Sequence, residues 1–111
     1  EVVDGRIRVR VAAGDPLDAV VLRSYAIGAA HMALGWITSE SLAVDDAGEV
    51  HDLTIRSFGV RRAIDPPPVE VEIDPAPGPP VNGSDAVFAV AAAVWLHQGA
   101  PTDLPTRRSF P

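Results

Sequence analysis

Short segments in which apolar and polar residues alternate predict the strands of this chain. Residues 7–12 (IRVRVA) alternate apolar residues with arginine, and residues 69–73 (VEVEI) alternate them with glutamate. A period of two is typical of strands that have one buried and one solvated face. Residues 41–45 and 50–56 predict a hairpin whose turn is formed by residues 46–49.

Two longer apolar segments predict helices. The first runs from about Leu17 to Ile37, and its length and many alanines favour a helix. The second, Ala86–His97, follows turn and N-cap residues at positions 82–85 and is ended by Gly99. This second segment is apolar on nearly every side, which requires burial on several sides. It therefore indicates a partner, a dimer or further polypeptide.

Proline-rich segments separate these elements. Residues 57–68 end in three consecutive prolines, residues 75–80 predict a rigid loop, and the tail to Pro111 is expected to be extended. Two helices and three or four short strands indicate the α+β class. We expect two layers, with two long helices packed on a small, mostly antiparallel sheet, and a single domain over residues 1–111.

Composition narrows the classes of protein. The net charge is -6, which argues against nucleic acid or an anionic membrane as the main partner. The chain has 0 cysteines, which excludes disulfides and cysteine ligands or nucleophiles. The longest apolar run, Tyr25 to Ile37, is too short to span a bilayer, and the first residues lack the pattern of a signal peptide. We expect a cytoplasmic protein.

Candidate catalytic and metal-binding residues are few. Three histidines occur, at positions 31, 51 and 97, and none has an acidic residue at helical ligand spacing. We therefore predict no metal site and interpret the histidines as structural or surface residues. Asp45–Asp46 and Glu70/Glu72 are explained by a turn and a solvated strand face. The sequence shows no phosphate loop, dinucleotide fingerprint or nucleophile elbow.

Two features rise above this background. The first is a stripe of mostly small residues at helical spacing on the first helix: Ser24, Gly28, His31 or Met32, and Gly35. It fits either close packing of another element or the approach of a flat ligand. The second feature is the start of the last helix at residues 82–85, which fits either a plain N-cap or a site for an anion.

The order of motifs resembles the C-terminal part of the molybdopterin-binding domain of the xanthine dehydrogenase/aldehyde oxidase (molybdenum hydroxylase) family. The segments that carry the resemblance are 23–28 (RSYAIG), 32–35 (MALG), 42–55 (LAVDDAGEVHDLTI), 57–67 (SFGVRRAIDPP) before VEVEI, 81–84 (VNGS) and Leu104–Pro105. They cover nearly the whole chain in the family's order, although the family domain is several times longer.

The resemblance implies which positions would contact a cofactor. These are Gly28, Met32, Gly35 and Ser84. Met32 stands where the family has a glutamine near the cofactor, and a thioether is only a weak acceptor. Ser84, or Gly83 under an alignment shifted by one residue, stands where the family has its general-base glutamate. Neither residue can act as that base, and Asp85 points to another side of the helix, so we predict no catalytic residue in this chain.

Three functions remain open at this point. The first is a stand-alone or split-off homologue of the family module, degenerate by itself, that acts as an accessory or self-associating domain. The second is a small subunit that completes a split molybdenum hydroxylase acting on an aldehyde or an N-heterocycle. The third is an unrelated small-ligand module that uses a groove at Gly28 and Gly35.

The expected cofactors and partners follow from these readings. We expect no cofactor on the isolated chain, and a molybdopterin cofactor only in a larger complex. The expected partner is a second copy of the chain or a larger oxidoreductase subunit, with no nucleic acid and no membrane.

Overall fold

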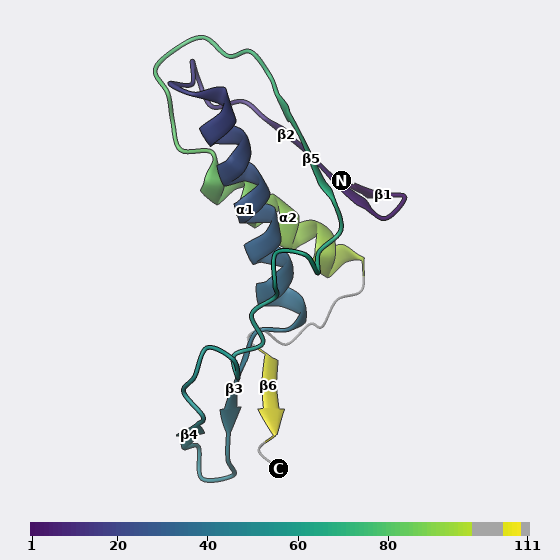
Figure 1. The fold of residues 1–111 in the computed structure, drawn as a ribbon, viewed down its shortest axis with the longest axis vertical. Helices are drawn as coiled ribbons and strands as arrows, with labels where there is room; N and C mark the ends of the chain where they lie inside the picture. Colours follow the sequence, from purple (N-terminus) through teal and green to yellow (C-terminus); the bar gives the residue numbers. More distant parts are fainter. Residues whose placement is uncertain (99–105, 110–111) are drawn as a thin grey trace.

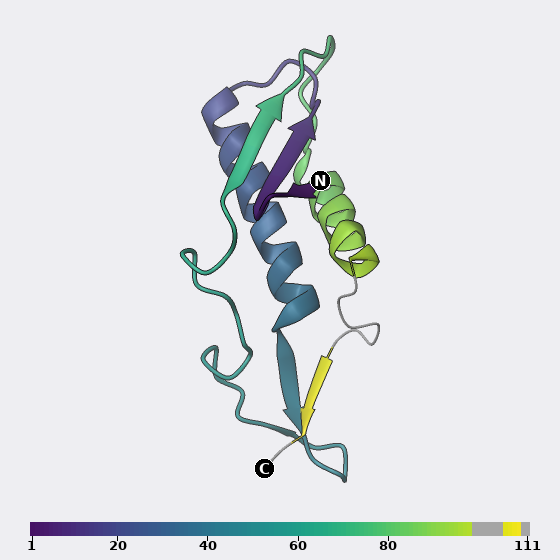
Figure 2. The ribbon, with the colours of Figure 1, turned by 90° about the vertical axis from the view of Figure 1, so that its right-hand side faces the viewer.

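The alternating segment near the N-terminus is the central strand of a three-stranded sheet. The computed structural model describes residues 1–98 and the backbone of residues 106–109. Strand β2 (Arg6–Val11) pairs with β1 (Val2–Val3) in antiparallel and with β5 (Val69–Ile73) in parallel orientation, as Figure 2 shows. The register places the arginines of β2 opposite the glutamates of β5 on one face and the aliphatic residues together on the other. The predicted division into a charged and an apolar face is confirmed.

Both predicted helices are present. Helix α1 (Ala19–Thr38) is capped by Asp18, whose Oδ1 accepts the N–H of Val20 at 2.7 Å. Helix α2 (Ser84–His97) begins two residues earlier than the sequence predicts. The two helices pack against each other and cover the apolar face of the sheet (Figure 1 and Figure 2).

The core lies between these three elements. Alanine supplies half of the buried residues of α1, which lets α2 and the sheet approach closely. The buried residues of α1 are Leu22, Ala26, Ala29, Ala30, Ala33, Leu34, Gly35 and Ile37. Near the end of α1 the rings of Trp36 and Phe88 lie 5.6 Å apart.

A second sheet lies beyond the C-terminal end of α1 (Figure 1). Its central strand β3 (Ser41–Val44) pairs with β4 (Val50–His51) in antiparallel and with β6 (Thr106–Ser109) in parallel orientation. Ser41 is buried, whereas Ala43 and Val44 are half-buried. The described part of this sheet therefore has little core of its own.

The α+β class with helices packed on a sheet is confirmed, but two details of the prediction are wrong. The strands form two mixed sheets instead of one mostly antiparallel sheet, because β2 and β3 each pair in parallel with a strand distant in sequence. The return strand of the hairpin is also shorter than residues 50–56. Asp52 has a φ of +52° and its carbonyl accepts the N–H of Thr54, so the chain turns there.

Strands β1 and β6 were not predicted as strands. A turn at Asp4 and Gly5, both with positive φ, joins β1 to β2. The extended tail is consistent with β6, but its pairing with β3 was missed. The predicted helix end at Gly99 lies outside the described residues, as do residues 100–105 and 110–111.

The molecule is elongated and exposes much apolar surface. Its radius of gyration is 16.3 Å, compared with about 13 Å for a compact chain of similar length. Leu17 is 93% exposed and Val90 is 62% exposed. Helix α1 is also long and apolar enough to cross a membrane by length and composition, a test that buried core helices of soluble proteins also pass. In this fold 44% of the most apolar 18-residue segment of α1 is buried inside the protein.

Candidate functional site

The stripe of small residues on α1 lies beside the face that packs on the sheet and on α2. Ser24 is exposed, Gly28 is half-buried, and Met32 is 57% exposed. A methyl group added at Gly28 would meet no described atom within 4 Å. At Gly35 it would lie 2.7 Å from Oε1 of Glu40, so the Glu40 side chain covers this end of the stripe. The close packing in α1 is made by the neighbouring alanines.

The start of α2 is held by its own loop. Oδ1 of Asn82 accepts the N–H of Ser84 at 2.9 Å, and Gly83 is buried at the N-cap position. A methyl group added at Gly83 would lie 3.0 Å from Cγ2 of Val11. Asp85, in the first turn, is exposed. The helix start thus has a glycine N-cap, a hydrogen bond from the Ser84 N–H to the Asn82 side chain and apolar surroundings, and no carboxylate at position 83 or 84.

The predicted cofactor-contacting residues are spread along the length of α1 and do not meet at one place. The position of an added methyl group at Gly83 is 3.9 Å from Cδ1 of Leu22, so α2 starts beside the first turn of α1. Gly35 lies thirteen residues further along α1, which at a rise of about 1.5 Å per residue is about 20 Å away. Gly28 and Met32 lie between these ends of α1 and Met32 faces solvent.

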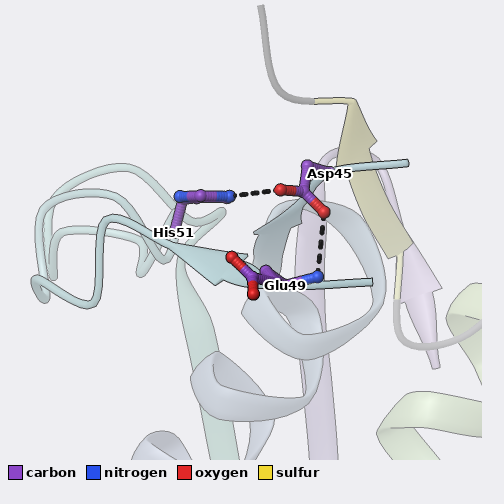
Figure 3. A group of neighbouring side chains, drawn as sticks. All are labelled: Asp45, Glu49 and His51. Carbon is purple, nitrogen blue, oxygen red and sulfur yellow. Dashed lines mark hydrogen bonds and ion pairs between the residues drawn. The ribbon is translucent and has the colours of Figure 1, made fainter. Parts of the chain in front are cut away.

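A different polar cluster forms at the tip of the second sheet. Asp45, Glu49 and His51 lie around the β3–β4 hairpin, and one potential ligand atom of each lies within 4.8 Å of the others (Figure 3). Nε2 of His51 lies 2.7 Å from Oδ2 of Asp45. The other carboxylate oxygen, Oδ1, accepts the N–H groups of Ala47 and Glu49, each at 2.9 Å.

These contacts explain the electrostatics of the cluster. The hydrogen bond with His51, followed by that with the Glu49 N–H, holds the pKa of Asp45 below its usual range. Both oxygens of Asp45 are used, one to hold the turn and the other to join its two strands. A divalent cation bound by all three side chains would replace the bond between His51 and Asp45. We therefore interpret the contacts of Asp45 as the ones that hold the hairpin closed, and we call them the hairpin clasp.

The sequence analysis missed this cluster because it searched for helical ligand spacing. Asp45 and His51 are six residues apart and meet only across a hairpin. The register, which pairs Val44 with Val50 and Ala43 with His51, brings them together. The predicted hairpin over the same residues was the signal that could have placed Asp45 beside His51.

Comparison with known proteins supports the fold alone. No family model matches the sequence, and no curated protein matches it. The fold is similar to part of the crystal structure of a Cu,Mo-CO dehydrogenase in its carbon monoxide reduced state, with a TM-score of 0.66 at 13% sequence identity. The similarity covers 77% of this chain and 11% of that chain. The chain therefore has a fold like that of a small part of a molybdenum-containing enzyme.

The residues present do not fit a molybdopterin cofactor held by this chain alone. The predicted contacts are two glycines, an exposed thioether and a serine, and they are spread along the length of α1. Neither Gly83 nor Ser84 carries an ionisable group for proton transfer. A large cofactor needs contacts from many segments, so no reaction step is assigned to these residues.

Proposed function

We propose that this chain is a module of a molybdenum hydroxylase-type assembly that is not catalytic by itself and acts by associating with further polypeptide. The observation that carries the proposal is the apolar surface that the fold leaves open on both helices. Val20, Tyr25 and Met32 are exposed on α1, Leu17 is exposed just before α1, and Val90 is exposed on α2. Apolar surface left exposed on a folded domain is a common mark of a site where another polypeptide binds.

The fold similarity supports the same proposal. The similar region is 11% of a much longer chain, so in that enzyme this fold is one part of a larger polypeptide. The elongated shape of the present chain agrees with a piece whose surface is completed by neighbours. We favour a self-associating or accessory module. In this form, the side of α1 that the family resemblance assigns to the cofactor contacts another polypeptide instead.

A second candidate is a subunit that completes a split molybdenum hydroxylase. The small share of the similar enzyme that the chain covers favours this candidate, because the remaining segments would then lie on other chains. In that case the general base and most cofactor contacts belong to the partner chains. Gly83 and Ser84, at the position of the family's base, carry no carboxylate.

Native mass and molybdenum content of the untagged protein, purified from its own host, test both candidates. An assembly that contains the chain with further subunits but no molybdenum supports the accessory module. An assembly with stoichiometric molybdenum supports the split enzyme. A monodisperse, metal-free monomer that stays monomeric at high concentration would contradict both.

A paired substitution sharpens the distinction. Met32→Gln with Ser84→Glu restores the two polar groups of the family at an exposed and a half-buried position. In an accessory module we expect unchanged metal content and unchanged activity of the assembly. In a split enzyme the pair changes the molybdenum content or the hydroxylase activity. Leu53→Gln, at an exposed position outside both helices, is the matched control.

A further inference from the structure

One side of α1 carries large apolar side chains that remain exposed in the described structure. Val21, Tyr25, Met32 and Trp36 are 45%, 61%, 57% and 39% exposed, respectively. They follow one another at helical spacing and therefore lie in one line along the helix. In Figure 2 α2 packs on one side of α1, and no described helix lies on the opposite side. We call these four residues the exposed face of α1.

This face carries no charge that would repel an apolar partner. Arg23 is the only Asp, Glu, Lys or Arg residue within α1. Its Nη1 donates to the carbonyl oxygen of Val71 in β5, which holds the guanidinium toward the first sheet. The acidic residues that give the chain its net charge of -6 thus all lie outside α1. An uncharged, apolar surface fits a partner surface of the same kind.

The order of residues on the exposed face makes it complementary to itself. Gly28 lies near the middle of α1, on the same side of the helix. Tyr25 and Met32 are equally far from the middle of the helix, and so are Val21 and Trp36. Two antiparallel α1 helices, related by a two-fold axis near Gly28, would place Tyr25 of one copy beside Met32 of the other. The same axis would place Val21 beside Trp36.

The contacts in such a pair are favourable. A thioether packs well on an aromatic ring, as Met32 would on Tyr25. The small Val21 side chain leaves room for the indole of Trp36. Glycine at the crossing point lets two helices approach closely, because their separation depends on the side chains at the contact. A glycine inside a helix costs stability, and no described atom lies within 4 Å of a methyl group added at Gly28. The space at Gly28 is therefore available to a second helix.

The area of the exposed face agrees with a weak but specific dimer. A buried aromatic side chain removes about 150–250 Å² from water, so the four residues with the neighbouring Val20 and Ile27 expose roughly 500 Å² on each copy. A pair would bury about 1,000 Å² in total, which is near the lower limit for a specific interface. We therefore expect a dimer that dissociates at micromolar concentrations.

We propose that the exposed face of α1 binds a second copy of this chain, with the two α1 helices antiparallel and crossing at Gly28. The proposal rests on the proposed function, because it names the surface and the occupant through which the module associates. In this dimer the face that the module uses for association is on the outer side of the helix pair, away from α2 and the first sheet.

Sedimentation equilibrium of the full chain over a range of concentrations measures the dimer. The average mass should rise with concentration from that of one chain toward that of two. Val21→Glu places a carboxylate in the contact and is expected to weaken the dimer about tenfold or more. Val90→Glu makes the same change at an exposed valine of α2 and is expected to leave the dimer unchanged. Both positions are exposed, so both variants should keep the circular dichroism of the folded chain.

A charge swap tests the antiparallel arrangement. Tyr25→Arg and Met32→Glu should each weaken the dimer about tenfold. The double variant should restore it, because antiparallel helices place the new arginine of one copy beside the new glutamate of the other. The two positions are seven residues apart in one helix, too far to pair within a copy. A parallel pair would instead oppose like charges, and the double variant would stay dissociated.

Each other outcome overturns the proposal. A chain that is monomeric at every concentration excludes this dimer. A dimer that Val90→Glu weakens, or that Val21→Glu leaves unchanged, uses another surface. A double variant that stays dissociated excludes the antiparallel crossing at Gly28. An isolated chain that is monomeric, combined with a native assembly that contains further subunits, would refute the α1 dimer alone. An α1 dimer that is catalytically active without further polypeptide would refute the proposed function alone.

Discussion

The two sheets of this chain are built from similar sequence patterns but are stabilised in different ways. The sheet of β1, β2 and β5 lies on two helices, and residues such as Ile7, Val11 and Leu22 are buried between them. The sheet of β3, β4 and β6 has no helix across either face in the described structure, as Figure 1 shows. Its order comes from backbone pairing and from polar contacts such as that between Asp45 and His51.

The junction between the two regions is also polar. Oγ of Ser39 donates to the carbonyl of Gly59 at 2.7 Å, and the N–H of Ser41 donates to the carbonyl of Phe58. Nε of Arg61 donates to Oγ1 of Thr38 at 3.1 Å. Burial of apolar surface contributes most of the stability of a fold, so the helix-backed region should open last and the second sheet first.

The largest expected effect follows from removing core volume in the helix-backed region. Ile37 is 0% exposed and packs with Ala33 and Ala92. Ile37→Ala should lower the free energy of unfolding by about 2–5 kcal/mol, measured by denaturant titration. Ile37→Val, which should cost about 0.5–1.5 kcal/mol, keeps the test informative if the alanine variant does not fold. If Ile37→Ala lowers the free energy of unfolding by less than Ile37→Val does, burial of this side chain does not stabilise the fold.

A smaller, local effect is expected at the junction. Gly59 has a φ of +74°, and a methyl group there would lie 2.2 Å from the carbonyl oxygen of Ser39. Gly59→Ala should cost about 2 kcal/mol or more, because the strain of the left-handed backbone adds to the clash. Gly48 has a φ of +86° and no described atom within 4 Å of an added methyl group. Gly48→Ala should therefore lower the free energy of unfolding only by the cost of the left-handed backbone, about 1–2 kcal/mol.

Hydrogen exchange shows which part of the protein is destabilised by Gly59→Ala. Amides of β3 and β4 should lose protection in Gly59→Ala while those in the middle of α1 keep theirs. Equal loss of protection in α1 would mean that the two regions unfold as one unit and would remove the contrast between them.

A gain in stability is expected at the small-residue stripe. Gly28 is inside α1, and an added methyl group there meets no described atom. Gly28→Ala should therefore raise the free energy of unfolding by about 0.5–1 kcal/mol, as measured by thermal or denaturant unfolding. Gly35→Ala should gain less, since its methyl group would displace the Glu40 side chain. A stabilised Gly28→Ala protein whose native assembly is lost would reveal that Gly28 serves a contact with a partner.

Local patterns were sufficient for the elements with a clear period. The alternation in VEVEI and the long apolar runs predicted β5, α1 and α2, because strand and helix periods are properties of neighbouring residues. The parallel pairing of β2 with β5 and of β3 with β6 was not predicted, since it joins segments that are far apart in the sequence. The Asp4–Gly5 turn was a usable signal for β1, but a strand of 2 residues has no period to detect.

The buried face of α1 was harder to predict than its existence. The helix is apolar on most sides, so the glycine stripe at positions 28 and 35 and the alanine stripe at positions 26, 30 and 33 both have helical spacing. The sequence analysis singled out the glycines, whereas the structure packs the alanines most closely. Whether the glycine stripe, Met32 and Ser84 serve a cofactor in a larger complex stays a prediction.

The smallest expected effect concerns the acid response of the second sheet. The pKa of Asp45 is lowered, first by its hydrogen bond with His51. A carboxyl with a lowered pKa in the folded state contributes stability above its ordinary pKa of about 3.9, and this contribution is lost as the pH falls through the folded pKa. The hairpin should therefore loosen in acid, below the ordinary range of aspartate.

Substitution of the histidine separates this contact from other ionised pairs. In His51→Leu, which has no side-chain donor, the pKa of Asp45 should rise toward its ordinary value, as measured by NMR titration of the side-chain carboxyl carbon. The pKa of Asp65, which is lowered by its hydrogen bond with Arg62, should stay where it is and serves as the internal control. An unchanged Asp45 titration would assign its low pKa to the N–H groups of the turn, and the clasp would then hold the turn without joining the two strands.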